Sequence, residues 1–417
     1  MALIHMLTMD MRRKRKNNKR GKMKFLVIGI IIVGFFSIAY FGLPSVIPLT
    51  YIGADSDMNS SVEYISGEKN MKIVKEEKFV ASHIDTPEAV KAIYMTSWVA
   101  GNPSFREKLV KIADETEVNS IIIDIKDYTG RIAFKVEDEM LQEVGAVENR
   151  IPDVREFIKL LHDKGIYVMG RISVFQDPYY VSKYPEFAVI RESDGEVWGD
   201  YKGISWLDAG SKQVWDYTVA IAKEAYANGF DELNFDYIRF PSDGNMNDIA
   251  YPFSEEKVLA DPNYGKAEVM RDFFKYLAGE MKDTGVVLSA DMFGMVTTNP
   301  DDLNIGQVLE YAEPYFDYIA PMTYPSHYPN GFNGWLNPNK EVYGVVKYSM
   351  DEAVRRMNEA SSTPSKIRPW LQDFDYGGNY DIAEVRAQIQ AVYDSGLTSW
   401  MLWAPSNVYT RGALFDE

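Results

Sequence analysis

From residue 91 onward, the hydrophobic positions of the chain follow a regular two-part pattern. Short runs that are apolar at nearly every position alternate with longer segments in which apolar residues recur every three or four positions. The short runs are typical of parallel strands buried on both faces, and the longer segments are typical of helices that cover them. Strands are predicted at residues 92–98, 119–125, 166–172, 233–238, 286–292, 318–323, 367–374 and 398–403.

Helical segments are predicted between these strands, at residues 104–116, 152–164, 213–228, 266–282, 305–311, 350–360 and 382–395. Eight strands alternating with helices favour an α/β chain folded as a closed (β/α)8 TIM barrel over residues 89–417. An open, doubly wound sheet is the alternative. Such a sheet usually has a Gly-rich phosphate turn after its first strand, whereas this chain has the helix-capping residues Gly101 to Ser104 there.

Long loops in this pattern follow strands, and the turns that lead from helix to strand are short. The long loops fall at residues 127–151, 173–212, 241–265 and 324–348. In a barrel of this kind, catalytic groups lie on the rim where the strands end. We therefore expect a functional site among these loops.

The N-terminal region has a different pattern. Residues 25–43 form an uncharged apolar run of about the ~20 residues that span a bilayer, so they predict a transmembrane helix. Residues 1–24 hold nine Lys or Arg and one Asp, a net charge of +8, and we expect them to stay in the cytoplasm. Residues 54–88 are polar and aperiodic and predict a linker. The barrel would then be extracytoplasmic, or secreted if residues 25–43 are instead a cleaved signal segment.

Composition limits the possible chemistry. The net charge of the chain is −17, so the part after residue 24 carries −25 and makes nucleic acid an improbable partner. The absence of cysteine excludes disulfides, thiolate metal sites and a cysteine nucleophile. The four histidines, at positions 5, 83, 162 and 327, form no local metal-binding pair, and we expect neither a metal nor a cofactor.

Two predicted strands end in an acid, Asp236 and Asp291. Burying a carboxylate is costly unless it is paired or hydrogen-bonded, so an acid at this place indicates either a function or a structural ion pair. Because side chains two apart share a strand face, we place Asn234 with Asp236, Ser289 with Asp291, and Leu371 with Asp373, all facing the barrel axis. A pair of carboxylates is what glycoside hydrolysis usually requires. We predict Asp236 as the nucleophile and Asp291 as the general acid/base.

Further candidates surround this pair. Asp124 is a candidate substrate or structural carboxylate, and Arg171 or Arg239 would keep Asp236 ionised or pair with it structurally. Asp373 would grip sugar hydroxyls or stabilise the rim. Sugar faces stack on aromatic rings, although many rings must serve ordinary packing. The predicted substrate-binding residues are Asp124, Arg171, Arg239, Asp373, Trp98, Tyr324, His327 and Trp403.

Several short strings give the chain a resemblance to a known group. The most specific is NFDYIRFP at residues 234–241, and weaker ones are IIDIKD at 122–127, SADMFG at 289–294 and PMTYP at 321–325. With these strings, residues 91–414 resemble the bacterial putative glycoside hydrolase domain family that is distantly related to the α-amylases. The resemblance implies a nucleophile after the fourth strand, at Asp236, and an acid/base after the fifth, at Asp291. The α-amylase clan commonly has Glu and Arg where this chain has Asp291 and Asn234.

These patterns together predict an anchored, extracytoplasmic glycosidase that cleaves a polysaccharide or oligosaccharide with retention. One alternative is a non-catalytic carbohydrate-binding barrel of the cell envelope, which would keep the aromatic rings without needing the acid pair. Another is a metal-assisted deacetylase or phosphodiesterase built from Asp124 and Asp127. The sequence does not indicate an oligomeric state.

Overall fold

The computed structural model describes residues 79–416, and they form a closed barrel of eight parallel strands in the order β1 to β8. The predicted segments 1–24 and 25–43, and most of 54–88, lie outside the described residues. Between residues 79 and 416, no helix has both the length and the apolar character needed to cross a membrane. The strands are β1 (Lys91–Met95), β2 (Ser120–Lys126), β3 (Tyr167–Ser173), β4 (Glu232–Asp236), β5 (Val287–Phe293), β6 (Tyr318–Met322), β7 (Trp370–Gln372) and β8 (Trp400–Trp403).

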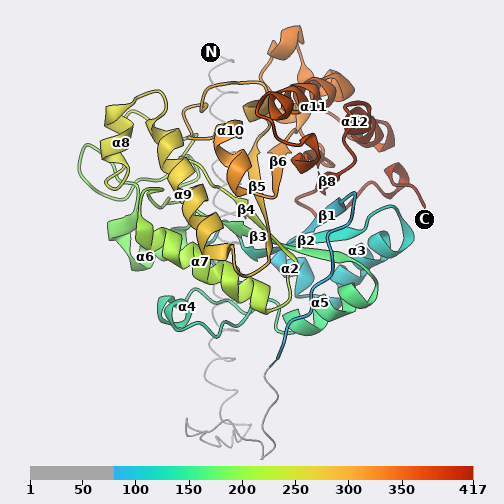
Figure 1. Ribbon diagram of the computed structural model, residues 1–417, viewed down its shortest axis with the longest axis horizontal. Helices are drawn as coiled ribbons and strands as arrows, with labels where there is room; N and C mark the ends of the chain where they lie inside the picture. The colour runs from blue at the N-terminus through green and yellow to red at the C-terminus, as the bar shows by residue number, and fades with distance from the viewer. Residues whose placement is uncertain (1–78, 417) are drawn as a thin grey trace, which may run out of the picture. The chain divides into compact units, whose positions relative to one another are not determined.

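Helices surround the barrel, with α7 and α9 on one side and α11 and α12 on another (Figure 1). The larger ones are α3 (Pro103–Glu115), α5 (Val154–Asp163), α7 (Lys212–Ala227), α9 (Gly265–Met281), α11 (Val342–Glu359) and α12 (Ile382–Asp394). Short helices occupy the loops: α2 (Ser97–Ala100), α4 (Glu139–Val144), α6 (Pro178–Lys183), α8 (Glu255–Ala260) and α10 (Leu309–Ala312). Local signals set many of the ends. For example, Asn102 caps α3, and α12 begins with a capping box between Asp381 and Glu384.

The predicted (β/α)8 barrel is thus confirmed, and its element boundaries need several corrections. The first strand ends at Met95 and gives way to α2, and the seventh strand has only the three residues of β7. Helix α11 begins at Val342, eight residues before the predicted start. The segment 342–349 contains Gly344 and Tyr348 and has weak helical periodicity in sequence, but burial of Val345 and Val346 stabilises it as helix.

Each strand packs its two faces against different partners. One face joins a large hydrophobic core shared with the helices, and the other fills the barrel interior with a smaller cluster that includes Tyr94, Tyr167, Met169, Trp370 and Met401. The predicted orientation of strand β7 is wrong. The Trp370 side chain points inward, so Leu371 and Asp373 share the face directed away from the axis, contrary to the prediction. A three-residue strand offers too little alternation to fix this phase from sequence.

The lower end of the barrel interior, where the strands begin, is closed by an ion pair and a strap (residues 79–90). Arg368 donates to Glu232 at 2.7 Å, and the Tyr167 hydroxyl donates to the same Glu232 carboxylate at 3.2 Å. From the strap, Thr86 hydrogen-bonds Tyr167 at 3.0 Å, and Ile84 packs against the interior cluster. The final residues of the predicted linker, 84–88, therefore lie against the barrel.

Candidate active site

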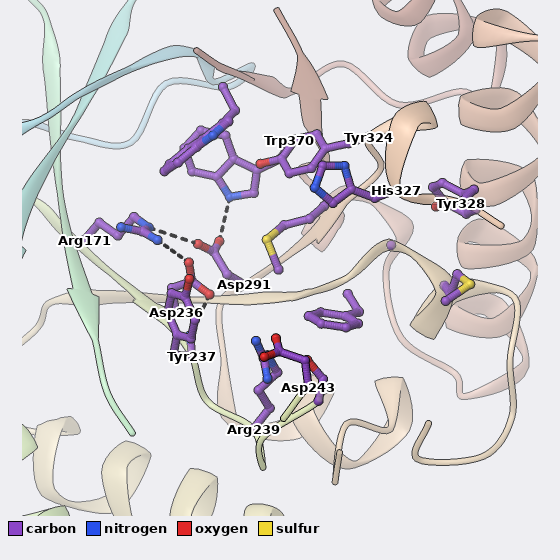
Figure 2. Close-up of a pocket in the computed structure, with 16 residues that line it drawn as sticks. Arg171, Asp236, Tyr237, Arg239, Asp243, Asp291, Tyr324, His327, Tyr328 and Trp370 are labelled. Atoms are coloured by element: carbon purple, nitrogen blue, oxygen red, sulfur yellow. Dashed lines mark hydrogen bonds and ion pairs between the residues drawn. The ribbon is translucent and has the colours of Figure 1, made fainter. Parts of the chain in front are cut away.

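At the upper end of the barrel, one guanidinium connects three carboxylates from three strands. Arg171, on β3, donates through Nη1 to Asp124 Oδ1 of β2 at 2.7 Å and through Nη2 to Asp236 Oδ2 of β4. Its Nε lies 3.7 Å from Asp291 Oδ2 of β5. All four side chains are buried, and Figure 2 shows Arg171 reaching both Asp236 and Asp291. Burial without partners would be unfavourable for every one of these groups, so each depends on the others.

Both carboxylate oxygens of Asp236 accept hydrogen bonds. Besides the Arg171 bond to Oδ2, the backbone N–H of Tyr237 donates to Oδ1 at 2.6 Å. Tyr237 has φ +52°, in the left-handed region that a bulky L-residue rarely adopts. Such a conformation costs about 1–3 kcal/mol and tends to occur at functional sites. The strained turn is what brings this N–H to the carboxylate.

Asp291 has the opposite environment. Its Oδ1 accepts hydrogen bonds from Asn234 Nδ2 at 2.8 Å and Trp370 Nε1 at 2.7 Å, and only 1% of the residue is exposed. Burial, followed by the negative charge of Asp236, raises the pKa of Asp291 to about 8, against the lowering effect of Arg171. Near neutral pH this carboxyl therefore keeps its proton. The site thus combines Asp236, which accepts from a cation and a backbone N–H, with a second acid that can donate a proton.

A pocket of about 370 Å³ opens over these two acids (Figure 2). This size lies within the usual range for small-ligand sites. Its walls come from strands β3 to β8 and from the loops that follow β4, β5 and β6. The lining residues are Arg171, Asp236, Tyr237, Arg239, Ser242, Asp243, Asp291, Phe293, Gly294, Met295, Met322, Tyr324, His327, Tyr328, Trp370 and Trp403.

Seven of the predicted site residues line this pocket: Asp236, Asp291, Arg171, Arg239, Tyr324, His327 and Trp403. Trp403 lies on the face of Tyr94 with ring centroids 4.0 Å apart, and the Arg171 guanidinium lies 5.0 Å from the Trp403 ring. His327 is held by Ser326 Oγ, 2.9 Å from Nδ1, and burial lowers its pKa. The imidazole therefore presents a neutral hydrogen-bonding group to the pocket.

Three predicted substrate-binding residues lie outside the pocket lining. Asp124 is covered by Arg171 and by the Tyr94 hydroxyl at 2.5 Å, so it positions Arg171. Asp373 accepts from Thr410 N at 2.9 Å and Thr410 Oγ1 at 2.6 Å, which fastens the loop after β8. Trp98 is 61% exposed, and its ring stacks with Arg150.

The structure also adds residues to the site that sequence reasoning had given no role. Asn234 and Trp370 hold the proton-bearing acid, and Tyr94 holds Asp124. Asn234 was detectable because it lies two residues before Asp236 on the same strand face. The contact of Trp370 with Asp291 joins residues 79 positions apart and had no local signal. Among residues 79–416, no three His, Cys, Asp or Glu side chains gather in a way that could hold a metal ion.

Comparison with known proteins identifies the family and the fold of the chain. A family described as a putative glycosyl hydrolase domain matches residues 92–409. A hypothetical protein from Ruminiclostridium thermocellum is 35% identical, over 48% of this chain and 96% of that chain, with a TM-score of 0.42. The PgaB (BpsB) glycoside hydrolase domain from Bordetella bronchiseptica is 14% identical, over 78% of this chain and 99% of that one, with a TM-score of 0.57, and it shows the same fold. No curated protein matches the chain.

The family match covers most of the chain and nearly all of the barrel, from β1 to the loop after β8. It confirms the resemblance drawn from the short strings. The chain belongs to the putative glycosyl hydrolase domain family and is a glycosidase.

Proposed function

We propose that the protein hydrolyses O-glycosidic bonds of a polysaccharide or oligosaccharide through Asp236 and Asp291, with retention of anomeric configuration. The observation that carries this proposal is the unequal pair at the base of the pocket. Asp236 accepts hydrogen bonds from the Arg171 guanidinium and the Tyr237 N–H, whereas burial raises the pKa of Asp291. An anionic nucleophile beside a protonated acid is the state in which a retaining glycosidase begins its cycle.

In the first step, Asp236 attacks the anomeric carbon and Asp291 gives its proton to the departing oxygen. The glycosidic bond breaks, and a glycosyl ester forms on Asp236. In the second step, Asp291, now ionised, takes a proton from a water molecule that attacks the same carbon. This breaks the ester and returns both carboxyls to their starting states, with two inversions giving net retention.

The shared guanidinium keeps the two catalytic carboxyls on the same part of the pocket floor. Arg171 contacts both acids, through Nη2 to Asp236 and through Nε to Asp291. A single guanidinium can contact two carboxylates only when they lie near each other. Retaining enzymes hold their two acids about 5–5.5 Å apart and inverting ones about 6.5–9.5 Å apart, and we propose the shorter separation for this pair.

The aromatic and polar walls of the pocket support a carbohydrate substrate. Trp403, Tyr324 and Trp370 line the pocket beside the acids, and aromatic rings of this kind pack against the apolar face of a sugar. His327 and Ser242 supply hydrogen-bonding groups for hydroxyls at other walls. The three positioning residues Asp124, Asn234 and Tyr94 take no part in the reaction itself.

The place of action is a separate part of the proposal. The basic segment 1–24 and the apolar segment 25–43 favour an N-terminal anchor with the barrel outside the cytoplasm. Protease added to intact cells should then remove the barrel and leave an N-terminal fragment in the membrane fraction. Protection of the barrel until the cells are lysed would contradict this location.

The test of function is release of reducing sugar from a panel of bacterial and plant polysaccharides by the full-length protein. Asp236→Asn and Asp291→Asn should fold and release none, whereas the control Asp373→Asn, which removes a rim acid outside the pocket, should keep activity. Proton NMR of the first product would show the anomeric outcome. Equal release by the parent and Asp236→Asn would refute the assignment, and glycan binding without release by the parent would indicate a sugar-binding barrel.

A further inference from the structure

A second arginine lines the pocket, and it differs from the other buried arginines of the molecule. Four arginines are buried between residues 79 and 416: Arg171, Arg239, Arg356 and Arg368. Three of them form salt bridges, Arg171 with its acids, Arg356 with Glu310 and Arg368 with Glu232. Within the described part of the chain, Arg239 has no carboxylate at salt-bridge distance although it is only 8% exposed. A buried cation without a counter-ion is unusual, because burial is unfavourable for an unpaired charge.

Aromatic rings hold the Arg239 guanidinium in a fixed place. Its carbon lies 4.8 Å from the ring centre of Trp206, 4.7 Å from that of Phe293 and 5.3 Å from that of Tyr237; we call these three residues the aromatic cage. Cation–π contacts of this kind stabilise a cation and fix its plane. One N–H of Arg239, on Nη1, donates to the Phe240 carbonyl at 3.0 Å. Among residues 79–416 the guanidinium makes no other hydrogen bond, so its remaining donors can serve a ligand.

The Arg239 guanidinium faces the pocket and not the hydrophobic core. Arg239 lines the pocket together with Asp236 and Asp291, and Figure 2 shows its guanidinium directed toward the pocket from the loop after β4. Asp243 lines the same region but is an exposed residue. The burial that lowers the pKa of Arg239 is only partly offset by Asp236, Asp243 and other nearby charged groups. A counter-ion brought by the substrate would complete the site.

We propose that the sugar bound beside the catalytic acids carries a carboxylate, as a hexuronate does, and that Arg239 binds that carboxylate. A planar guanidinium matches a carboxylate with two parallel hydrogen bonds, and the aromatic cage keeps it in the orientation needed for such a pair. This inference rests on the proposed function, because it assigns the substrate class of the same pocket. It makes Arg239 a specificity determinant with no part in bond cleavage.

The test compares matched oligosaccharides that differ only in charge. The probes are oligogalacturonate, oligomannuronate and a glucuronate-containing oligosaccharide, each beside its carboxyl-reduced neutral counterpart. Binding is measured by calorimetry with the full-length Asp236→Asn protein, which cannot turn the probes over. At least one anionic probe should bind about 10- to 100-fold more tightly than its neutral partner, as expected for charge-assisted hydrogen bonds.

Variants at position 239 then test whether Arg239 causes the preference for the anionic probe. In the same background, Arg239→Met keeps much of the side-chain length and should remove the preference by weakening the anionic probe alone. Arg239→Lys keeps the positive charge but not the planar guanidinium, so it should retain part of the preference for the anionic probe. The control Arg191→Met removes an exposed arginine outside the pocket and should change nothing. Unfolding curves check that each variant folds.

Several outcomes would overturn the inference. The first is that every anionic probe binds as tightly as its neutral partner. The second is that a folded Arg239→Met variant loses affinity for the anionic and the neutral probe equally. The third is that a sugar phosphate binds more tightly than any uronate. The proposed function fails separately. If the parent hydrolyses neutral glycans and Arg239→Met does so equally well, the glycosidase stands and the carboxylate subsite does not. If uronates bind through Arg239 and the parent cleaves none of them, the subsite stands and the assigned reaction does not.

Discussion

The two ends of the barrel interior are built from the same kinds of residue but do different things. Glu232 and Asp236 lie four residues apart on the same face of β4. At the lower end Glu232 accepts a hydrogen bond from Arg368, which comes just before β7, and at the upper end Asp236 accepts one from Arg171 of β3. At the lower end, one acid pairs with one arginine, and the strap covers them. At the upper end, three acids share Arg171 beneath an open pocket.

The difference shows what turns a buried ion pair into a reactive site. At the lower end the charges of the single acid and the single arginine balance. When several acids crowd one cation, one of them is left under-compensated, and desolvation together with the neighbouring charge raises its pKa, as at Asp291. Access for substrate is the second requirement. A buried acid at a strand end is therefore not enough to indicate catalysis. The site must also contain more acids than cations and a pocket that admits substrate.

The largest expected effect comes from removing the nucleophile at the upper end. Asp236→Asn should lower kcat by about 10⁴-fold or more, since the amide cannot form the glycosyl ester. The free energy of unfolding should change little, because Asn can still accept the Tyr237 N–H and the Arg171 guanidinium keeps Asp124 and Asp291 as partners. Steady-state kinetics and urea unfolding of the same preparation separate the two effects. A variant with nearly normal kcat would show that Asp236 has only a structural role, like Glu232 at the lower end.

The reverse result is expected at the lower end. Arg368→Met leaves Glu232 buried without its cation and should cost about 3–5 kcal/mol of unfolding free energy. The double variant Glu232→Leu/Arg368→Met removes both charges and should recover most of that loss. Urea unfolding measures both, and kcat of the folded fraction should stay near the parent value. A large loss of kcat in a stable double variant would contradict the separation of the two ends.

The proton on Asp291 should be visible in the pH dependence. Because the pKa of Asp291 is raised to about 8, the general acid is present below that pH, and kcat/KM should fall about tenfold per pH unit above it. The same raised pKa means that folding is favoured by protonation, so the parent should lose stability relative to Asp291→Asn as pH rises from about 4 toward 8. A profile flat through pH 9 would argue against Asp291 as the proton donor.

The smallest effect is expected at the rim. Asp373→Asn keeps one acceptor for Thr410 but loses the charge, so it should cost about 1–2 kcal/mol of stability. We expect no change in KM or in the pH profile. Thermal unfolding and kinetics at two pH values measure this. A raised KM with unchanged stability would instead support the predicted role of Asp373 in substrate binding.

Sequence periodicity predicted the barrel and the acids at the ends of β4 and β5, because both depend on local patterns. It did not reveal that Arg171 joins three strands, since that contact network depends on closure of the barrel. Nor did it give the inward face of β7, where Trp370 contacts Asp291, or the left-handed backbone at Tyr237. The tyrosine there carries no local turn signal, because Gly or Asn would be the residue expected at such an angle.

That mismatch at Tyr237 has a consequence for directed evolution of this protein. The backbone would be relieved by Gly, whereas the side chain is needed where it is, between Trp206 and Arg239. Tyr237→Gly would therefore relieve a strain of about 1–3 kcal/mol but delete a ring that packs on the core, so any such variant that survives a screen for heat resistance alone should lose the wall that orients Arg239. Screens that retain substrate turnover as a second criterion would keep the tyrosine and find their stabilising changes elsewhere.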